Sequence, residues 1–317
     1  MKVSINAIEY YLPTRKEDNN ILLKENPDWC LKDIESKTGI KSRYISAPDE
    51  TATDLAFCAG EKLLKSGINI KEIDFLILVT QSGDYALPTS ACILQDRLGL
   101  KTTCMAFDIN LGCSGFVYGL TVGGSLIESN QAKQGLLICS DTYSKYIDKN
   151  DRACRSVFGD GASATQLVFN KKGNLGPFEM GTDGSGHKNL IVPESGQRKS
   201  QDVTGGNKLY MNGSSVFMFT MDMVPKCIIA LLKKSSLNTN DIDLFIFHQA
   251  SKLVIDSIIR RLKLNEKKVF VNYSEIGNTV SSSIPIAIKE ASEMGVLKKG
   301  DKIMLVGFGV GYSWGGC

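Results

Sequence analysis

The feature that most constrains the fold of this chain is a weak internal repeat, in which residues 73–140 and residues 242–307 follow one pattern. Each copy opens with a continuous apolar run headed by Asp74 or Asp243, and such a run is typical of a strand buried on both faces. Two further short strands follow in each copy, separated by helical stretches. They are predicted at residues 105–109 and 135–139 in the first copy and at residues 268–272 and 302–306 in the second. The order strand, helix, strand, helix, strand is therefore used twice.

Strands that alternate with helices predict parallel strands joined by crossover helices, so the expected fold class is α/β with two duplicated βαβαβ-type halves. Residues 170–201 are rich in Gly, Lys, Ser and Asn, which favours a boundary with exposed loops. We therefore predict an N-terminal half over residues 1–170 and a C-terminal half over residues 171–317. Facing halves would bring equivalent strand-to-helix turns close to a shared axis.

Composition narrows the class of protein. The chain has 317 residues, 43% hydrophobic and 22% charged, and its formal net charge of +3 is spread without a basic block, which disfavours a nucleic-acid partner. The apolar runs are only as long as strands, so we expect no membrane segment. Glu9 interrupts the N-terminal apolar residues before they could form the apolar region of a secretory signal, so we expect no such signal and a cytoplasmic location. Nine cysteines without a Cys-x-x-Cys pair, beside two histidines, predict neither a disulfide framework nor a metal site.

Cys113 is the candidate nucleophile. It follows Gly112 and directly precedes residues 114–128, whose apolar pattern predicts a buried helix. Unpaired amides and the positive dipole end at a helix start favour thiolate over thiol and can hold an oxyanion. A small buried residue in a tight turn is the alternative interpretation, and this local context leaves both open.

His248 and Asn278 are the candidate partners of Cys113. His248 ends an apolar strand at the carboxyl edge where open α/β sheets bind ligands. Asn278 occupies the place in the second repeat that Cys113 occupies in the first, which predicts that they meet at the centre. A structural imidazole and a helix N-cap are the respective alternatives. The other histidine, His187, lies in a glycine-rich loop and is expected to be a solvated bystander.

Several short motifs occur in one order: Leu-Gly-Cys-Ser-Gly-Phe, Phe-Gly-Asp-Gly-Ala, His-Gln-Ala-Ser, Gly-Asn-Thr and Gly-Phe-Gly-x-Gly-x-x-Trp-Gly. Across essentially the whole chain this series resembles β-ketoacyl-acyl-carrier-protein synthase III, the initiating condensing enzyme of bacterial fatty-acid synthesis. The resemblance implies a thiolase-like fold with layered α/β/α/β/α architecture. It also implies a homodimer, no permanently bound cofactor, acyl-CoA as a substrate and acyl carrier protein as a partner.

The resemblance also implies a role for each candidate. Cys113 would accept an acyl group from acyl-CoA, and His248 and Asn278 would assist the decarboxylative condensation with malonyl-acyl carrier protein. The backbone amides of Cys113 and Val310 would form the oxyanion hole. Leu87 would reach toward the pocket of the partner subunit. The substrate-binding residues implied by the resemblance are Thr38, Leu87, Arg152, Met211, Gly213, Phe217 and Ser251.

Some positions depart from the pattern of this family. Asp33 stands where a tryptophan usually stacks on the CoA adenine, Leu87 where phenylalanine is common, Val310 where glycine is usual, and Leu253 where an arginine often docks the carrier protein. These departures motivate a second hypothesis, a specialised cysteine acyltransferase that passes the acyl group to a non-malonyl acceptor. A third hypothesis is a catalytically silent binding subunit that retains the fold.

Overall fold

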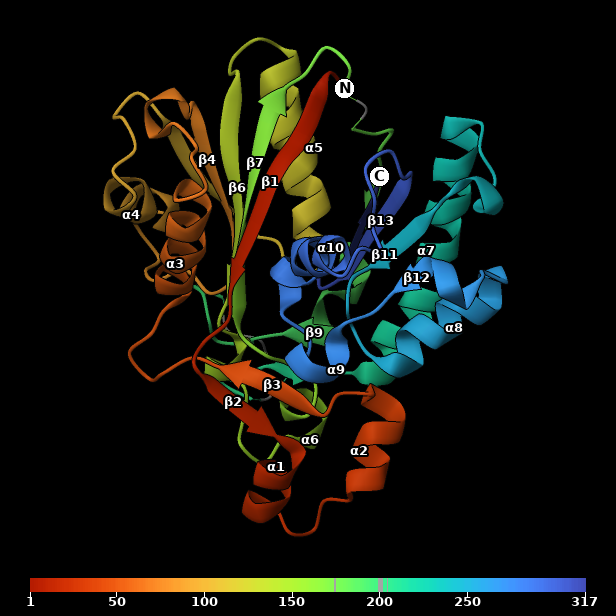
Figure 1. Cartoon of the computed structure of the whole chain (residues 1–317). Helices are drawn as coiled ribbons and strands as arrows, with labels where there is room; N and C mark the ends of the chain where they lie inside the picture. The colour runs from red at the N-terminus through yellow and green to blue at the C-terminus, as the bar shows by residue number, and fades with distance from the viewer. Residues whose placement is uncertain (174, 199–201, 204) are drawn as a thin grey trace.

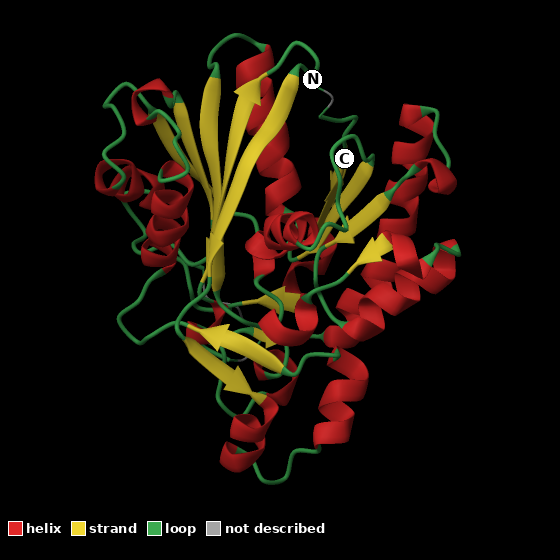
Figure 2. Ribbon diagram, viewed as in Figure 1, coloured by secondary structure: helices red, strands yellow, loops and turns green. Residues whose placement is uncertain are grey.

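The computed structural model describes residues 1–173, 175–198, 202–203 and 205–317. Within these residues, two five-stranded sheets fan out from a common base and helices lie between and outside them (Figures 1 and 2). The segment in which we predicted the domain boundary, residues 170–201, includes positions 174 and 199–201, which lie outside the described residues.

The first sheet has the strand order β1-β7-β6-β4-β5. β4 runs parallel to β5 and β6, whereas β7 runs antiparallel to β6 and β1. Every residue of β4 is buried, as its unbroken apolar sequence predicts. The strands are β1 (Val3–Tyr11), β4 (Phe75–Val79), β5 (Met105–Ile109), β6 (Gln134–Asp141) and β7 (Gly161–Phe169).

The second sheet has the order β12-β11-β13-β14-β8, and β11 runs parallel to β12 and β13. The strands are β8 (Glu179–Thr182), β11 (Leu244–Phe247), β12 (Val269–Phe270), β13 (Ile303–Gly309) and β14 (Ser313–Gly316). The parallel triplets β5-β4-β6 and β12-β11-β13 correspond to the two sequence repeats. The first sheet ends at Phe169 and the second begins at Glu179, while the division of the chain into two domains near residue 171 stays a prediction.

The helices form three layers around the two sheets (Figure 1). α5 and α10 lie between the sheets, α3 and α4 cover the outer face of the first sheet, and α7 and α8 cover the second. One apolar core joins Phe75 and Phe116 on the first side to Ile284 and Leu305 on the second. The bounds are α3 (Ala52–Leu64), α4 (Ser90–Arg97), α5 (Gly115–Glu128), α7 (Gly213–Ser235), α8 (Lys252–Leu262) and α10 (Ser283–Glu293).

Glycines allow α5 to lie close to the first sheet. A Cβ atom added at Gly115 would lie 2.3 Å from Val79 Cγ1, and one at Gly119 would lie 2.4 Å from Leu137 Cδ1. Both separations are shorter than real Cβ contacts, and Gly123 continues the same row one turn later. These glycines thus fix the position of the start of α5, and with it the position of Ser114, the residue that precedes the helix.

A smaller region of short elements lies at one end of the molecule, at the bottom of Figure 1. It contains a two-stranded ribbon, β2 with β3, and a second short pair, β9 with β10. The elements are β2 (Arg15–Asp18), α1 (Asn19–Glu25), α2 (Leu31–Thr38), β3 (Ser42–Ile45), α6 (Arg152–Arg155), β9 (Leu190–Ile191), β10 (Tyr210–Met211) and α9 (Tyr273–Ile276).

The 23 residues of α7 are long and apolar enough to cross a membrane, with a mean hydropathy of 1.7 over 18 residues, and the sequence patterns did not reveal this helix. In the structure α7 packs on β8, β13, β14 and α8. Its buried face includes Val224, Ile228 and Leu231. These contacts are those of a covering helix, which packs one apolar face against the second sheet.

Candidate active site

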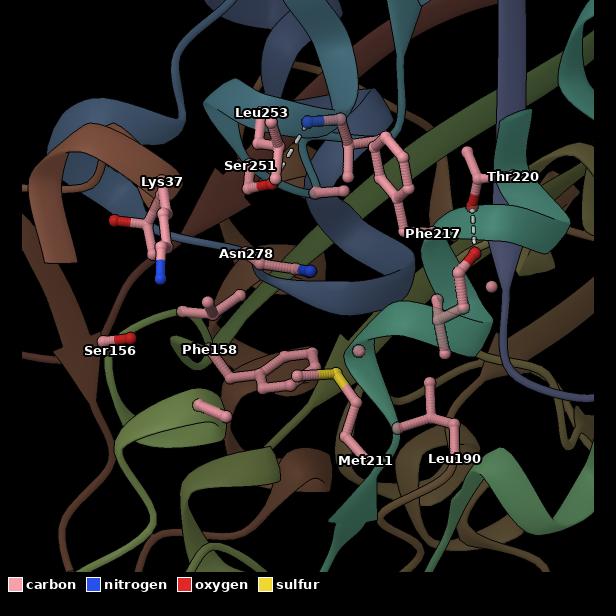
Figure 3. Close-up of a pocket in the computed structure, with 18 of the residues that line it drawn as sticks. Lys37, Ser156, Phe158, Leu190, Met211, Phe217, Thr220, Ser251, Leu253 and Asn278 are labelled. Carbon is pink, nitrogen blue, oxygen red and sulfur yellow. Dashed lines mark hydrogen bonds between the residues drawn. The ribbon is translucent and has the colours of Figure 1, made fainter. Parts of the chain in front are cut away.

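One cavity of about 350 Å³ brings the three predicted catalytic residues together. Cys113, His248 and Asn278 all line it, although the first comes from one repeat and the other two come from the second. Figure 3 shows the Asn278 side chain directed into this cavity, whose walls include Phe158 and Met211. The convergence predicted from the repeat is therefore present in the geometry.

The Cys113 side chain is only 5% exposed and lies directly before Ser114, the N-cap of α5. The Ser114 hydroxyl is hydrogen-bonded to that of Ser313, at 2.7 Å between the oxygens, which ties this turn to β14. A Cβ atom at Gly309 would lie 3.0 Å from the Cys113 sulfur, so the glycine leaves room for β13 to approach it. The backbone N–H groups of Cys113 and Val310 both interact with the sulfur.

The acidity of Cys113 differs from the sequence expectation. The pKa of the thiol is raised to about 12, first by burial and then by the nearby carboxylate of Asp141, while the amides of Cys113 and Val310 offset this shift only in part. α5 begins at Gly115, two residues after Cys113, so the helix start does not outweigh the loss of hydration. Together these causes favour the thiol over the thiolate, the direction opposite to the one expected from the position of Cys113 alone.

His248 follows β11 directly and is 2% exposed. Its Nδ1 is hydrogen-bonded to the Ser283 hydroxyl at 2.7 Å, and its ring meets the Phe308 ring edge-on with centroids 5.6 Å apart. Burial lowers the imidazole pKa to about 3, although the Val280 backbone opposes this shift. At neutral pH the ring is therefore uncharged and carries one N–H.

Asn278 is held by its own backbone and by the next turn. Its N–H donates to the Val157 carbonyl at 2.9 Å, and its Oδ1 accepts from the Val280 N–H at 2.9 Å. Within the described part of the chain its Nδ2 has no hydrogen-bond partner, so this amide can donate into the cavity. Val280 adopts a φ of 54°, which is uncommon for a β-branched residue, and this conformation forms the turn that holds Oδ1.

Most of the predicted substrate-binding residues line the same cavity, and one does not. Those in the lining are Thr38, Arg152, Met211, Gly213, Phe217 and Ser251. The Ser251 hydroxyl also caps α8 by accepting from the Val254 N–H. Leu87 lies outside the cavity and is 82% exposed. The reach of Leu87 into the pocket of a partner subunit stays a prediction.

Sequence reasoning missed Asp141, the last residue of β6, which is fully buried beside the site. A carboxylate at the end of a parallel strand of the first repeat was the available signal, but a single aspartate there is not distinctive. Sequence reasoning also missed the apolar wall formed by Phe158 and Leu190. Among the described residues, no group of three or more His, Cys, Asp or Glu side chains could hold a metal ion.

Comparison with known proteins gives consistent results. The family model for 3-oxoacyl-[acyl-carrier-protein (ACP)] synthase III matches residues 107–184, and the model for its C-terminal part matches residues 232–317. The chain is 38% identical to the β-ketoacyl-[acyl-carrier-protein] synthase III of Clostridioides difficile (strain 630) over 322 residues, covering 99% of this chain and 97% of that protein.

Solved structures agree with this relationship. A crystal structure of a 3-oxoacyl-(acyl-carrier-protein) synthase III superposes with a TM-score of 0.95 at 43% identity, covering 99% of this chain and 98% of the other. The β-ketoacyl-[acyl carrier protein] synthase III of Thermus thermophilus has a TM-score of 0.90 at 36% identity, covering 99% and 97% of the two chains. The similarity therefore extends over the whole layered architecture.

Proposed function

The chain belongs to the 3-oxoacyl-[acyl-carrier-protein] synthase III family of condensing acyltransferases with a thiolase-like fold, and we propose that it joins an acyl group from acyl-CoA to malonyl-acyl carrier protein. Cys113 carries the acyl group, and His248 and Asn278 assist the decarboxylation. The observation that most strongly supports these roles is that residues from both repeats line one cavity.

In the first step the Cys113 sulfur attacks the thioester carbonyl of acyl-CoA. The bond between the carbonyl carbon and the CoA sulfur breaks, and the Cys113 S–H proton ends on the departing CoA thiol. The oxyanion accepts hydrogen bonds from the N–H groups of Cys113 and Val310, the two amides that already interact with the sulfur. Because burial favours the thiol over the thiolate, the proton leaves as the sulfur attacks.

In the second step the malonyl thioester loses carbon dioxide, and its electron pair forms an enolate. The enolate oxygen accepts hydrogen bonds from Asn278 Nδ2 and from His248 Nε2, in the tautomer whose Nδ1 accepts from Ser283. The enolate carbon then attacks the acyl-Cys113 carbonyl, and the carbon–sulfur bond to Cys113 breaks. A solvent proton restores the thiol and the 3-oxoacyl thioester is released.

The cavity suits the long thioester arm of either substrate. Met211 and Phe217 give apolar walls, while the exposed side chains of Lys37 and Arg152 place positive charge at the mouth. Such cations suit the phosphates that precede the arm in CoA and in a carrier protein. We assign substrate binding to this surface together with Thr38, Gly213 and Ser251, which also line the cavity.

Intact-mass measurement after incubation with acetyl-CoA tests the loading step. The wild-type protein should gain the mass of one acetyl group, and Cys113→Ala should gain none. Cys92→Ala is the matched control, because Cys92 is an exposed cysteine outside the cavity. If no acyl-CoA changes the wild-type mass, or if Cys113→Ala is still acylated, the proposed role of Cys113 is wrong.

Release of labelled carbon dioxide from malonyl-acyl carrier protein tests the condensation step. His248→Ala should lose this release, whereas His187→Ala should retain it, since His187 is exposed and outside the cavity. The specialised-acyltransferase hypothesis predicts the opposite, that is, acyl loading on Cys113 without any carbon dioxide release. A subunit without catalytic activity would show neither reaction.

We also propose that the protein is a homodimer and works in the cytoplasm, where acyl-CoA and acyl carrier protein are found. Leu87 and Tyr85 are 82% and 67% exposed on one loop, an unusual cost for apolar side chains in a monomer. The Ser90 and Ala91 N–H groups bond to Asp108 and hold this loop against β5, the free edge of the first sheet.

A further inference from the structure

Asp141 joins the two halves of the molecule behind the nucleophile. Its Oδ1 accepts from the Gln81 N–H at 2.8 Å and from the Ser82 hydroxyl at 3.5 Å, both in the turn after β4. Its Oδ2 accepts from the Ser281 hydroxyl at 2.5 Å and from the Ser281 N–H at 3.4 Å. Ser281 lies three residues after Asn278, so one carboxyl group links the Asn278 turn to the first sheet.

This carboxyl group is buried without a positively charged partner. Asp141 is 0% exposed, and within the described part of the chain no Lys, Arg or His forms an ion pair with it. Burial raises the Asp141 pKa to about 7, while the hydrogen bonds from Ser281, Gln81 and Ser82 oppose this change. An unpaired buried acid is costly for stability, which calls for a role in the site.

The Asp141 charge acts on several groups packed around it. Gln81, whose N–H donates to Asp141, lies against the residue before Cys113, because a Cβ atom added at Gly112 would lie 2.6 Å from Gln81 Oε1. The charge raises the pKa of the Cys113 thiol, second only to burial as a cause. Other titratable groups on the surrounding elements feel the same charge, and all of them are neutral acids. They are Cys139 on β6 and Tyr143 and Tyr146 in the segment after it. None of them can neutralise the carboxylate.

We propose that Asp141 is a positioning residue of the condensing site, which holds the Asn278 turn against the first sheet and places a negative charge behind the turn that carries Cys113. The proposal rests on the function proposed above. The two effects belong to different properties of one group, since the hydrogen bonds to Ser281 place Asn278 and the negative charge acts on the Cys113 sulfur. Separate substitutions can therefore separate them.

Asp141→Asn tests the charge. The amide keeps the carbonyl acceptor for the Gln81 N–H and can donate to the Ser281 hydroxyl, so it removes the charge with little loss of the link. Cys113 alkylation by iodoacetamide, followed by peptide mass mapping, should be about tenfold faster than in wild type at pH 8. The ratio should approach one below pH 6, where the wild-type carboxyl group is protonated.

Ser281→Ala tests the link. It removes the short hydrogen bond but keeps the carboxyl group, so carbon dioxide release from malonyl-acyl carrier protein should fall by about tenfold through misplacement of Asn278. Cys113 alkylation should stay within about twofold of wild type. Ser140→Ala is the matched control, because this buried hydroxyl, on the residue before Asp141 in β6, donates to the Ala52 carbonyl rather than to Asp141 or the Asn278 turn.

Two results would overturn the proposal: an Asp141→Asn alkylation profile that superposes on the wild-type profile, or a Ser281→Ala variant that matches Ser140→Ala in carbon dioxide release. A purely structural role would slow alkylation and release together, without a change in the pH profile. Failure of the wild-type protein to accept an acyl group would contradict the proposed function instead, and the alkylation comparison would still stand.

Discussion

Single residues of the site share one property, which is that they are uncharged at neutral pH. Burial raises the Cys113 pKa to about 12 and lowers the His248 pKa to about 3, and Asn278 has no titratable group. Hydrogen-bond donors directed at a developing negative oxygen therefore keep their protons across the physiological range. The site differs from a thiolate–imidazolium pair, in which activation depends on charge separation before substrate binds.

The Nδ2 donor of Asn278 gives the first residue-scale prediction. Asn278→Asp keeps the Oδ1 that accepts from the Val280 N–H but replaces the donor with a second negative oxygen. We expect carbon dioxide release to fall by at least about 100-fold, since a donor to the enolate is lost and a like charge is added. Acetyl loading measured by intact mass should remain. A variant that loses both reactions equally would assign Asn278 a structural role.

The pH dependence of stability follows from Asp141. Its pKa is about 7 in the folded protein and near 3.8 when unfolded, so the folded state binds a proton that the unfolded state has released. This contribution is complete below pH 4 and is lost as pH rises through 7. The unfolding free energy of Asp141→Asn minus that of wild type should therefore increase by roughly 3 kcal/mol as the pH rises from 5 to 8. Urea denaturation at each pH measures this difference in unfolding free energy. A difference that stays constant from pH 5 to pH 8 would contradict the prediction.

His248 also makes the stability of the protein depend on pH, so the effect of Asp141 must be measured as the difference between wild type and Asp141→Asn rather than on wild type alone. Its depressed pKa means that the unfolded state takes up a proton between about pH 6.5 and pH 3, so wild-type stability falls with acid in that window. Asp141 acts in the opposite direction there. Because both proteins contain His248, its contribution cancels in the difference.

The sequence was informative about Cys113 and Asn278 because they follow predicted strands at equivalent points of the two repeats. It was informative about His248 because this residue ends a predicted strand at the carboxyl edge of the sheet. It could not predict Asp141, since the partner Ser281 lies 140 residues away and no local pattern joins them. The sequence also could not predict the Cys113 pKa, because desolvation depends on tertiary packing rather than on the position of a helix. The roles of the three residues stay predictions until the experiments above are done.

At the scale of elements, the long apolar strands were predictable and the short ones were not. The predicted strand at 105–109 coincides with β5, whereas the predicted strand at 268–272 shrinks to Val269–Phe270. Strands of two to four residues, such as Leu190–Ile191 and Tyr210–Met211, are too short to show a period of two. These short elements surround the mouth of the cavity, so the sequence predicted the candidate catalytic residues better than it predicted the walls of the entrance.

The contact of α5 with the first sheet gives the element-scale prediction. Gly119→Ala places a Cβ atom 2.4 Å from Leu137 Cδ1, which pushes the helix that begins after Cys113 away from the sheet. We expect a loss of about 1–3 kcal/mol in unfolding free energy, together with slower acetyl loading. Denaturant titration and intact-mass kinetics measure the two effects.

Gly124→Ala is the matched control for that experiment. It lies on the same helix, but its added Cβ atom would meet only the Met1 side chain at 2.7 Å and Leu175 at 3.7 Å. The flexible methionine can move, and alanine favours the helix by about 1 kcal/mol, so this variant should be neutral or more stable. Equal destabilisation of both variants would contradict the importance of the close contact at Gly119.

At the scale of the whole molecule, the fold class and the layered architecture were predicted by the repeat and by the resemblance, and both are confirmed. The repeat determines which strands are parallel and which turns face each other. It says nothing about which outer surface meets another chain. That information lies instead in exposed apolar side chains, and Leu87, Tyr85 and Met105 are 82%, 67% and 38% exposed beside the free β5 edge.

Leu87→Arg tests whether this surface forms the homodimer. Burying an unpaired guanidinium at the centre of an interface is costly, so light scattering after size-exclusion chromatography should show a shift from dimer to monomer. Met294→Arg is the control, because Met294 is also exposed, at 69%, but lies at the end of α10. It should leave the dimer intact.

The same variant separates assembly from pocket contact. If Leu87 closes the pocket of the partner subunit, acetyl loading should fall in Leu87→Arg, and Leu87→Ala should alter acyl-chain preference while the dimer persists. If the wild-type protein were a monomer with full activity, the proposed homodimer would be wrong, and the exposed loop would no longer be explained by an interface. A dimer unaffected by Leu87→Arg would place the interface on another surface, and chain-length preference of the Leu87→Ala protein would then match wild type.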